Sequence, residues 1–116
     1  MIIDYSVKGL KVSTKKYVID FRDVDHYSEI HKVIKESLNF PDYYGCNWSA
    51  FWDCLADLYG DPIHIEIIGI DVIEQKFENV ADQIVTILKK FKHYEKSFED
   101  DIQIEFIRGS KRIEIE

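Results

Sequence analysis

Cysteine is scarce in this chain of 116 residues, which contains only Cys46 and Cys54. Two thiols are too few for a disulfide framework, and their spacing matches no zinc-binding pattern. Because Cys54 falls on the apolar side of a predicted helix, we expect it to be a small core residue. Cys46 precedes that helix and is expected to be an incidental loop thiol.

Long apolar runs are also lacking, since none approaches the roughly 20 residues that a membrane-spanning helix needs. No charged-then-apolar leader precedes a cleavage site, and there are no repeats, low-complexity tracts or linkers. A hydrophobic content of 46% with 14% aromatic residues argues against disorder. We therefore expect one cytoplasmic domain over residues 1–116, with a single core.

Familiar catalytic motifs are missing: there is no G-x-S-x-G, Walker loop, G-x-G-x-x-G or H-E-x-x-H. The histidines, at positions 26, 31, 64 and 93, are scattered singly. Asp53 and Asp57 are one helical turn apart, but a helix face offers no concave site for a metal and Trp52 is a poor neighbour for one. The sequence predicts no enzyme, no cofactor and no metal site.

Basic residues are outnumbered, with 15 Lys and Arg against 22 Asp and Glu and a net charge of −7. Phosphate binding needs a basic face, so this balance disfavours nucleic acid as a direct ligand. It suits a basic protein partner such as a ribonuclease. Acidity of this size is also common in proteins that need it only for solubility.

Apolar periodicity predicts the secondary structure. Ile63, Ile65 and Ile67 alternate with His64 and Glu66, as in a strand with one buried face. Strands separated by helices imply parallel βα units, so the predicted class is α/β. The expected elements are strands over 15–20, 63–68 and 102–107, and helices over 27–38, from 48 to about 59, over 72–77 and over 80–91.

The chain ends add further strands to this pattern. Residues 108–111 predict a hairpin turn, and residues 112–116 alternate like an antiparallel edge strand. Residues 1–10 could pair with that edge or form a ribbon of their own. These terminal strands could pack within the domain or mediate a homodimer. The predicted core is Phe51, Cys54, Leu55, Ile65, Ile67, Ile84, Ile87, Leu88, Ile104 and Phe106.

Residues 40–55 form the most distinctive stretch, reading FPDYYGCNWSAFWDCL. Pro41 ends the preceding element, and Gly45 is expected to take a positive φ where the chain turns. Asn47 is a good N-cap for a helix that starts at residue 48.

In that helix, apolar residues at positions 48, 51, 55 and 58 share a face that we expect to be buried. Ser49, Asp53 and Asp57 share another face and should stay accessible. Exposed tyrosine and tryptophan beside carboxylates are typical of a protein interface.

The motif P-D-Y-Y-G-x-N over residues 41–47, followed by W-D-C-L over residues 52–55, resembles the barstar family of intracellular ribonuclease inhibitors. The resemblance covers residues 16–107 and is strongest from 40 to 68. It implies a small three-stranded parallel sheet flanked by helices, with the terminal strands as additions. It also implies a cis peptide between Asp61 and Pro62.

The resemblance assigns Asp53 to the nuclease active site, where it takes the place of an RNA phosphate; a solvated helix aspartate is the plain alternative. Of the two adjacent tyrosines, Tyr43 is expected to contact the partner and Tyr44 to plug the loop into the core, although the reverse stays open. The expected partner-binding residues are Tyr43, Gly45, Asn47, Ser49, Trp52, Asp53, Ala56 and Asp57.

Three positions depart from the family pattern. Ser49 and Lys90 stand where the family has acidic contacts, and Leu58 stands in place of a tryptophan, while Asp57 can partly restore the lost charge. These changes indicate a divergent ribonuclease, such as a toxin domain, as the partner. A structural or adaptor protein that uses the same fold to form homo-oligomers is the alternative.

Overall fold

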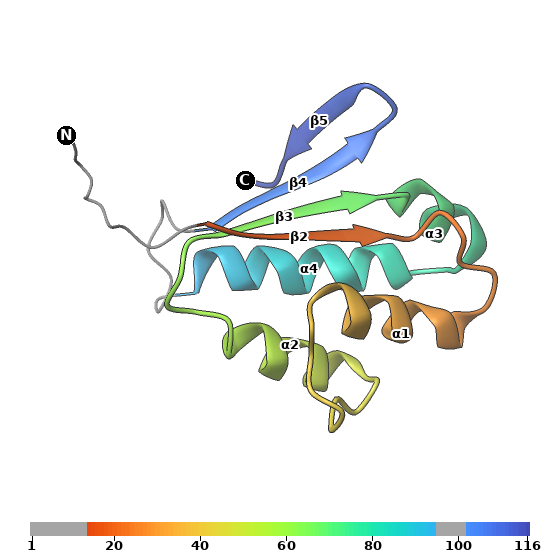
Figure 1. The fold of residues 1–116 in the computed structure, drawn as a ribbon. Helices are drawn as coiled ribbons and strands as arrows, with labels where there is room; N and C mark the ends of the chain where they lie inside the picture. The colour runs from red at the N-terminus through yellow and green to blue at the C-terminus, as the bar shows by residue number, and fades with distance from the viewer. Residues whose placement is uncertain (1–13, 95–101) are drawn as a thin grey trace.

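The computed structural model describes residues 14–94 and 102–116. Within these ranges, a pair of helices follows each of the first two strands, and two adjacent strands end the chain (Figure 1). No helix in the described ranges is long and apolar enough to cross a bilayer. The elements are β2 (Lys15–Asp20), α1 (Tyr27–Ser37), α2 (Trp48–Ala56), β3 (Ile63–Ile68), α3 (Ile70–Lys76), α4 (Val80–His93), β4 (Ile102–Arg108) and β5 (Lys111–Glu114).

These strands form one sheet in the order β2-β3-β4-β5. The first three are parallel, with Lys15 paired to Ile63 and Ile63 to Ile102. β5 returns antiparallel to β4. The predicted α/β class, three-stranded parallel sheet and antiparallel C-terminal strand are therefore confirmed. The expected pairing of residues 1–10 lies outside the described residues.

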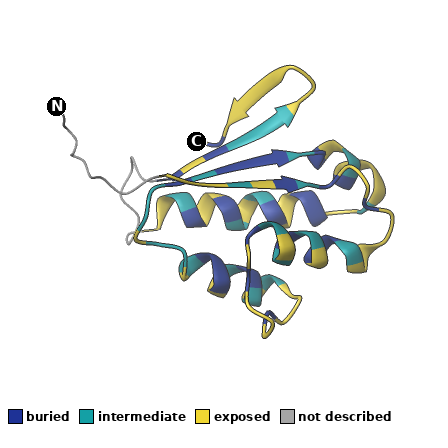
Figure 2. Cartoon of the chain, in the orientation of Figure 1, coloured by how far each residue is buried: buried dark blue, intermediate teal, exposed yellow. Residues whose placement is uncertain are grey.

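The helices α1, α2 and α4 lie on one side of the sheet, and α3 follows the carboxyl end of β3 (Figure 1). α4 runs along the sheet, while α2 packs against α4 and is farther from the strands. Buried residues line the sides of the sheet and helices that face one another, whereas β5 is exposed along its length (Figure 2). The other side of the sheet has no helix over it in the described residues.

The predicted core is confirmed except at two positions, Ile87 and Phe106, which are only partly buried. Ile87 lines a surface groove beside Trp48 rather than the interior. Phe106 is paired with Ile113, which is 47% exposed, so this end of the sheet has less helical cover. Trp48, the first residue of α2, and Leu58, two residues beyond its last, were expected on the buried face and are likewise only half-buried.

The predicted cis peptide at Asp61–Pro62 is wrong: no described residue has a cis peptide bond. The trans form is the more stable isomer of an X–Pro bond by about 0.5–1 kcal/mol. In this form, the carbonyl of Pro62 accepts a hydrogen bond from the Lys15 N–H at 2.9 Å, where β2 and β3 begin to pair.

Helix boundaries also shift from the expected ones. α2 ends at Ala56 rather than near residue 59. The residues after it form a turn that reaches Gly60, whose φ is +121°. α3 begins at Ile70 rather than at residue 72, because the left-handed Gly69 turns the chain directly out of β3. The Gly69 conformation is restricted to glycine here: a Cβ atom would lie 2.9 Å from the backbone nitrogen of Arg22.

Candidate partner-binding surface

The start of α2 is fixed by the loop before it. The Asn47 side-chain oxygen accepts the Ala50 N–H at 2.8 Å, which confirms the predicted N-cap. The Asn47 amide donates to the carbonyl of Gly45 at 3.3 Å, so the same side chain also holds the turn that precedes the helix. The helix therefore begins in one defined orientation.

One side of α2 is buried in the core. Phe51 and Leu55 are fully buried, and Cys54 is 5% exposed. Burial, with the nearby carboxylates of Asp57 and Asp53 adding to it, raises the pKa of the Cys54 thiol. Cys54 is thus a core residue as predicted, and this side of the helix fixes its rotation.

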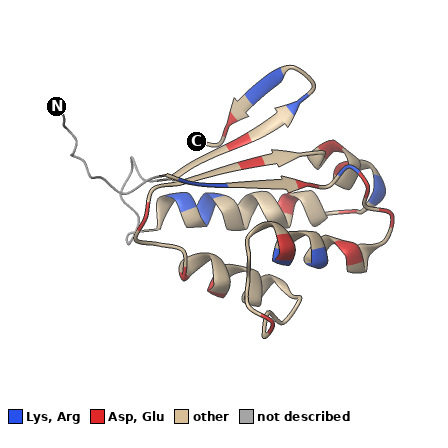
Figure 3. Ribbon diagram, in the orientation of Figure 1, with Lys and Arg blue, Asp and Glu red and all other residues tan. Residues whose placement is uncertain are grey.

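The opposite side of α2 presents Ser49, Asp53 and Asp57 to solvent, as the sequence predicted. Among the described residues, none forms an ion pair with Asp53 or Asp57. Figure 3 shows acidic and no basic residues along α2. Ala56, which the sequence analysis also assigned to the partner-binding surface, is half-buried. The helix holds an unpaired carboxylate near its middle and a second one at its C-terminal end.

The two tyrosines of the preceding loop have opposite environments. Tyr43 is 77% exposed, whereas Tyr44 is 6% exposed and packs on Phe40. The Tyr44 hydroxyl lies 2.6 Å from Nδ1 of His31 on α1. Tyr44 therefore plugs the loop into the core, and Tyr43 stays available to a partner.

His31 is a buried residue that the sequence analysis missed. It is 2% exposed, contacts the Trp48 ring with centroids 4.6 Å apart, and leaves Nε2 without a hydrogen-bond partner among the described residues. Burial lowers the pKa of His31 and raises that of Tyr44. The sequence did hold a sign that His31 is buried, because it lies one helical turn from both Tyr27 and Ile34 on α1.

The turn at residues 45–46 differs from the prediction. Cys46, with φ of +55°, takes the left-handed conformation that was expected of Gly45. A Cβ atom on Gly45 would lie 3.3 Å from the Asn47 side chain and 3.6 Å from Cβ of Ala50. Glycine at position 45 therefore allows the loop to pack closely against the start of α2. Cys46 is exposed in the loop, as predicted.

Trp52 borders the acidic side of α2 and is held by residues beyond this helix. Nζ of Lys90 on α4 lies 4.1 Å from the centroid of its ring, a cation–π contact. Tyr94 meets the same ring edge-on with centroids 5.3 Å apart, and Tyr94 in turn stacks on Tyr59. Lys90 is therefore part of the surface around Asp53, through a contact that sequence spacing did not reveal.

A groove of about 400 Å³ runs between the start of α2 and α4. Its lining is mixed, with apolar Ile87 and Trp48 beside polar Gln83 and Asp82. The surface of α2 therefore offers aromatic side chains beside carboxylates that pair with no cation among the described residues, and the groove lies at the start of the same helix. This arrangement can receive a cationic side chain from another protein, and it contains no nucleophile paired with a base among the described residues.

A small α/β domain with such a surface has the features of a protein-binding module. Comparison with known proteins identifies its class further. The family described as "Barstar (barnase inhibitor)" matches residues 14–107, so the chain belongs to the barstar family, whose members are ribonuclease inhibitors and not enzymes. The family resemblance read from residues 40–68 is thereby confirmed.

A relative from Bacillus subtilis (strain 168), named "Putative ribonuclease inhibitor YrdF", is similar over much of the chain. It is 30% identical over 76 residues, which cover 66% of this chain and 84% of that protein. Neither comparison assigns roles to individual residues of the surface.

Proposed function

We propose that this protein inhibits a basic ribonuclease one to one by placing Asp53 in its active site, where the carboxylate occupies the position of an RNA phosphate. The observation that carries the proposal is the state of Asp53. It is exposed, it lies on a helix whose other side is fully buried, and no described residue neutralises its charge.

A free carboxylate in this position suits a cationic pocket for two reasons. Guanidinium groups bind carboxylate and phosphate through the same bidentate geometry, so one anion can replace the other. The buried side of α2 and the Asn47 cap hold the backbone of Asp53 in place, which lowers the entropy cost of binding. The helix provides a fixed anion rather than a flexible one.

The residues around Asp53 would exclude water from the contact. Trp52 is restrained between Lys90 and Tyr94, and Tyr43 projects from the loop with most of its surface free. Aromatic side chains of this kind bury much area for little rotamer entropy and lower the local dielectric constant around an ion pair. The proposed contact surface is Tyr43, Gly45, Asn47, Ser49, Trp52, Asp53, Ala56 and Asp57.

The charges on this surface indicate what kind of nuclease fits. Lys90 lies on Trp52 beside the acidic side of α2, and Ser49 adds no charge to it. The partner would present a cationic active site to Asp53 and an acidic or neutral group to Lys90. We infer a divergent ribonuclease, such as a toxin domain, that the inhibitor neutralises in the cytoplasm of the cell that produces both.

Competition with a substrate phosphate tests this proposal. A basic ribonuclease, sought first among the neighbouring reading frames, would be titrated with the inhibitor while RNA cleavage and binding of a nucleoside monophosphate are both measured. We expect cleavage to stop at a one-to-one ratio and the nucleotide to be displaced. Tight binding that leaves the nucleotide bound would contradict active-site occupation.

A further inference from the structure

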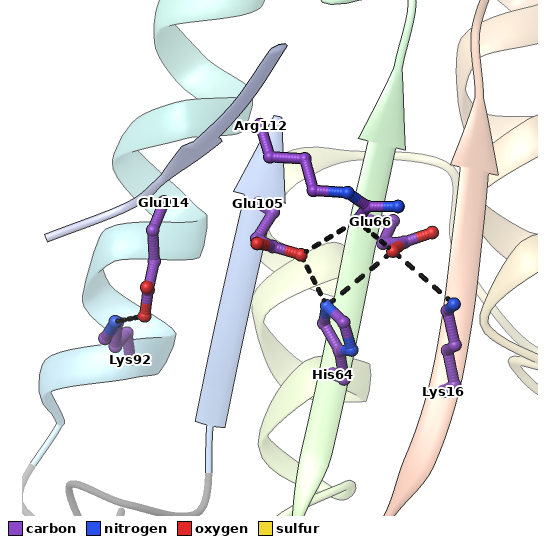
Figure 4. A network of polar contacts seen from close by, with 7 residues as sticks. All are labelled: Lys16, His64, Glu66, Lys92, Glu105, Arg112 and Glu114. Carbon is purple, nitrogen blue, oxygen red and sulfur yellow. Dashed lines mark hydrogen bonds and ion pairs between the residues drawn. The ribbon is translucent and has the colours of Figure 1, made fainter. Parts of the chain in front are cut away.

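The side of the sheet without helical cover carries a cluster of polar side chains from four strands (Figure 4). His64 and Glu66 stand two residues apart on β3, and Glu105 stands opposite Glu66 on β4. Lys16 on β2 and Arg112 on β5 reach toward these carboxylates. The cluster is separated from α2 by the sheet and by α4.

The nitrogen of His64 and the carboxylate oxygens of Glu66 and Glu105 lie close together. Nε2 of His64 lies 2.8 Å from Oε1 of Glu105 and 3.9 Å from Oε2 of Glu66. One donor atom from each of the three residues lies within 4.8 Å of the others. Their side chains are only 22%, 9% and 13% exposed for His64, Glu66 and Glu105, so they are held in position rather than spread over a solvated surface.

The two carboxylates are directly opposed on neighbouring strands, an arrangement that is unfavourable unless a cation lies between them. Arg112 supplies that cation: its Nη1 lies 2.5 Å from Glu66 and 3.2 Å from Glu105. Lys16 approaches Glu66 at 3.4 Å. Hydrogen bonds from Arg112 and His64 hold the pKa of Glu66 and of Glu105, respectively, below their usual values.

We propose that His64, Glu66 and Glu105 form a binding site for a divalent transition-metal ion such as Zn²⁺, and that Arg112 is the internal cation with which the metal competes. One imidazole and two carboxylates are ligands that Zn²⁺ accepts, and the two carboxylates balance its charge. Three protein ligands leave the fourth position to water, as in open zinc sites.

The geometry requires small movements. Ligand atoms about 2.1 Å from a tetrahedral ion are roughly 3.4 Å apart. The present separations from Nε2 of His64, 2.8 and 3.9 Å, lie on either side of that value. On binding, Nε2 would give up its hydrogen bond to Glu105 and its proton would reside on Nδ1. Arg112 and Lys16 would move outward, and both are more than half exposed, at 55% and 54%.

The role of Arg112 makes the proposal specific. In an ordinary ion-pair cluster, removing Arg112 only leaves two repelling carboxylates. In a metal site, the same change removes the competing cation and leaves that repulsion for the metal to relieve. Metal affinity should therefore rise when Arg112 is neutralised, even though the affinity of most sites falls when a nearby side chain is lost.

Calorimetric titration with Zn²⁺ alone, on the full chain in a non-chelating buffer at neutral pH, tests the site. We expect one ion per chain with a dissociation constant in the micromolar range. His64→Ala and Glu105→Gln should each weaken binding by about tenfold or more, since each removes a ligand. Arg112→Gln should tighten it by roughly fivefold or more, and Lys16→Ala by a smaller factor.

Two controls separate the metal site from the rest of the molecule. His26→Ala removes an exposed histidine outside the cluster, and Asp53→Ala removes the carboxylate of the proposed nuclease contact; neither should change Zn²⁺ affinity. Nitrogen NMR of the His64 ring should show the Nε2 resonance shifting on addition of Zn²⁺. Undetectable Zn²⁺ binding, unchanged affinity in His64→Ala, or failure of both Arg112→Gln and Lys16→Ala to tighten binding would show a purely structural ion-pair cluster.

Discussion

The two sides of α2 differ in both burial and charge. Leu55 is fully buried, while Asp53, only two positions earlier, is exposed and without a cation among the described residues. Burial of the first side gives the helix its stability and its rotation. The second side carries carboxylates that pair with no cation among the described residues, so they can serve a partner.

This division predicts that stability and inhibition depend on different residues of one short helix. Substitutions on the buried side should lower the free energy of unfolding and affect inhibition only through it. Substitutions on the exposed side should change affinity for the nuclease and leave folding intact. Single substitutions on each side of α2 can test that separation.

Leu55→Ala should lower the free energy of unfolding by roughly 2–5 kcal/mol, because it leaves a cavity in a packed core. Ser49→Ala, on the exposed side of the same helix, should change it by less than about 0.5 kcal/mol. Urea denaturation followed by circular dichroism measures both. Comparable losses for the two variants would mean that α2 is rotated from the orientation described above.

Tyr44→Phe should lower the free energy of unfolding by about 1–3 kcal/mol, because it removes the hydroxyl partner of the buried His31. Tyr43→Phe makes the same chemical change at a side chain that is 77% exposed and should be neutral for stability. Thermal unfolding of the pair compares them. An equal effect from both would contradict the assignment of Tyr44 as the residue that anchors the loop.

Stability should fall as the pH drops below about 6.5, the ordinary pKa of histidine. Because burial lowers the pKa of His31 in the folded state, the unfolded chain binds a proton that the folded chain does not. The contribution of His31 to the change of the free energy of unfolding with pH is at most about 1.4 kcal/mol per pH unit. His31→Gln should remove this part of the pH dependence in denaturation curves between pH 7 and 5, and a variant with the wild-type slope would contradict it.

Asp57→Ala should weaken nuclease binding by less than about 1 kcal/mol, since Asp57 stands at the C-terminal end of α2, nearer the rim of the surface. The loss should shrink further as salt is added, because exposed charges are screened. Association rates at low and high ionic strength measure it. An effect of Asp57→Ala that is larger than that of Asp53→Ala would move the centre of the interface by one helical turn.

Which residues of α2 are buried and which are exposed could largely be predicted from sequence, because the pattern that decides it is local. The Asn47 cap and the spacing of Phe51 and Leu55 depend only on neighbours along the chain, and both were confirmed. The family resemblance, rather than any periodic pattern, predicted that Tyr43 is exposed and Tyr44 is buried, because periodicity does not distinguish two adjacent loop residues.

Features that depend on distant contacts were missed or misassigned. The left-handed residue of the turn is Cys46, whereas Gly45, where a positive φ was expected, lies close to the start of α2. His64 and Glu105 are 41 residues apart in the sequence and come into contact across neighbouring strands, so the scattered single histidines gave no sign of a cluster. Strand register, rather than composition, brings those groups together.

The dissociation constant of Asp53→Ala for the nuclease tests the central claim most directly. Removing this carboxylate should leave the cations of the nuclease active site without an anion and weaken binding by about 2 kcal/mol or more, roughly 30-fold. Asp71→Ala, an exposed carboxylate on α3, serves as the matched control and should bind like wild type. The free energy of unfolding of Asp53→Ala should stay within about 1 kcal/mol of wild type. An Asp53→Ala protein that folds normally and inhibits as strongly as wild type would contradict the account.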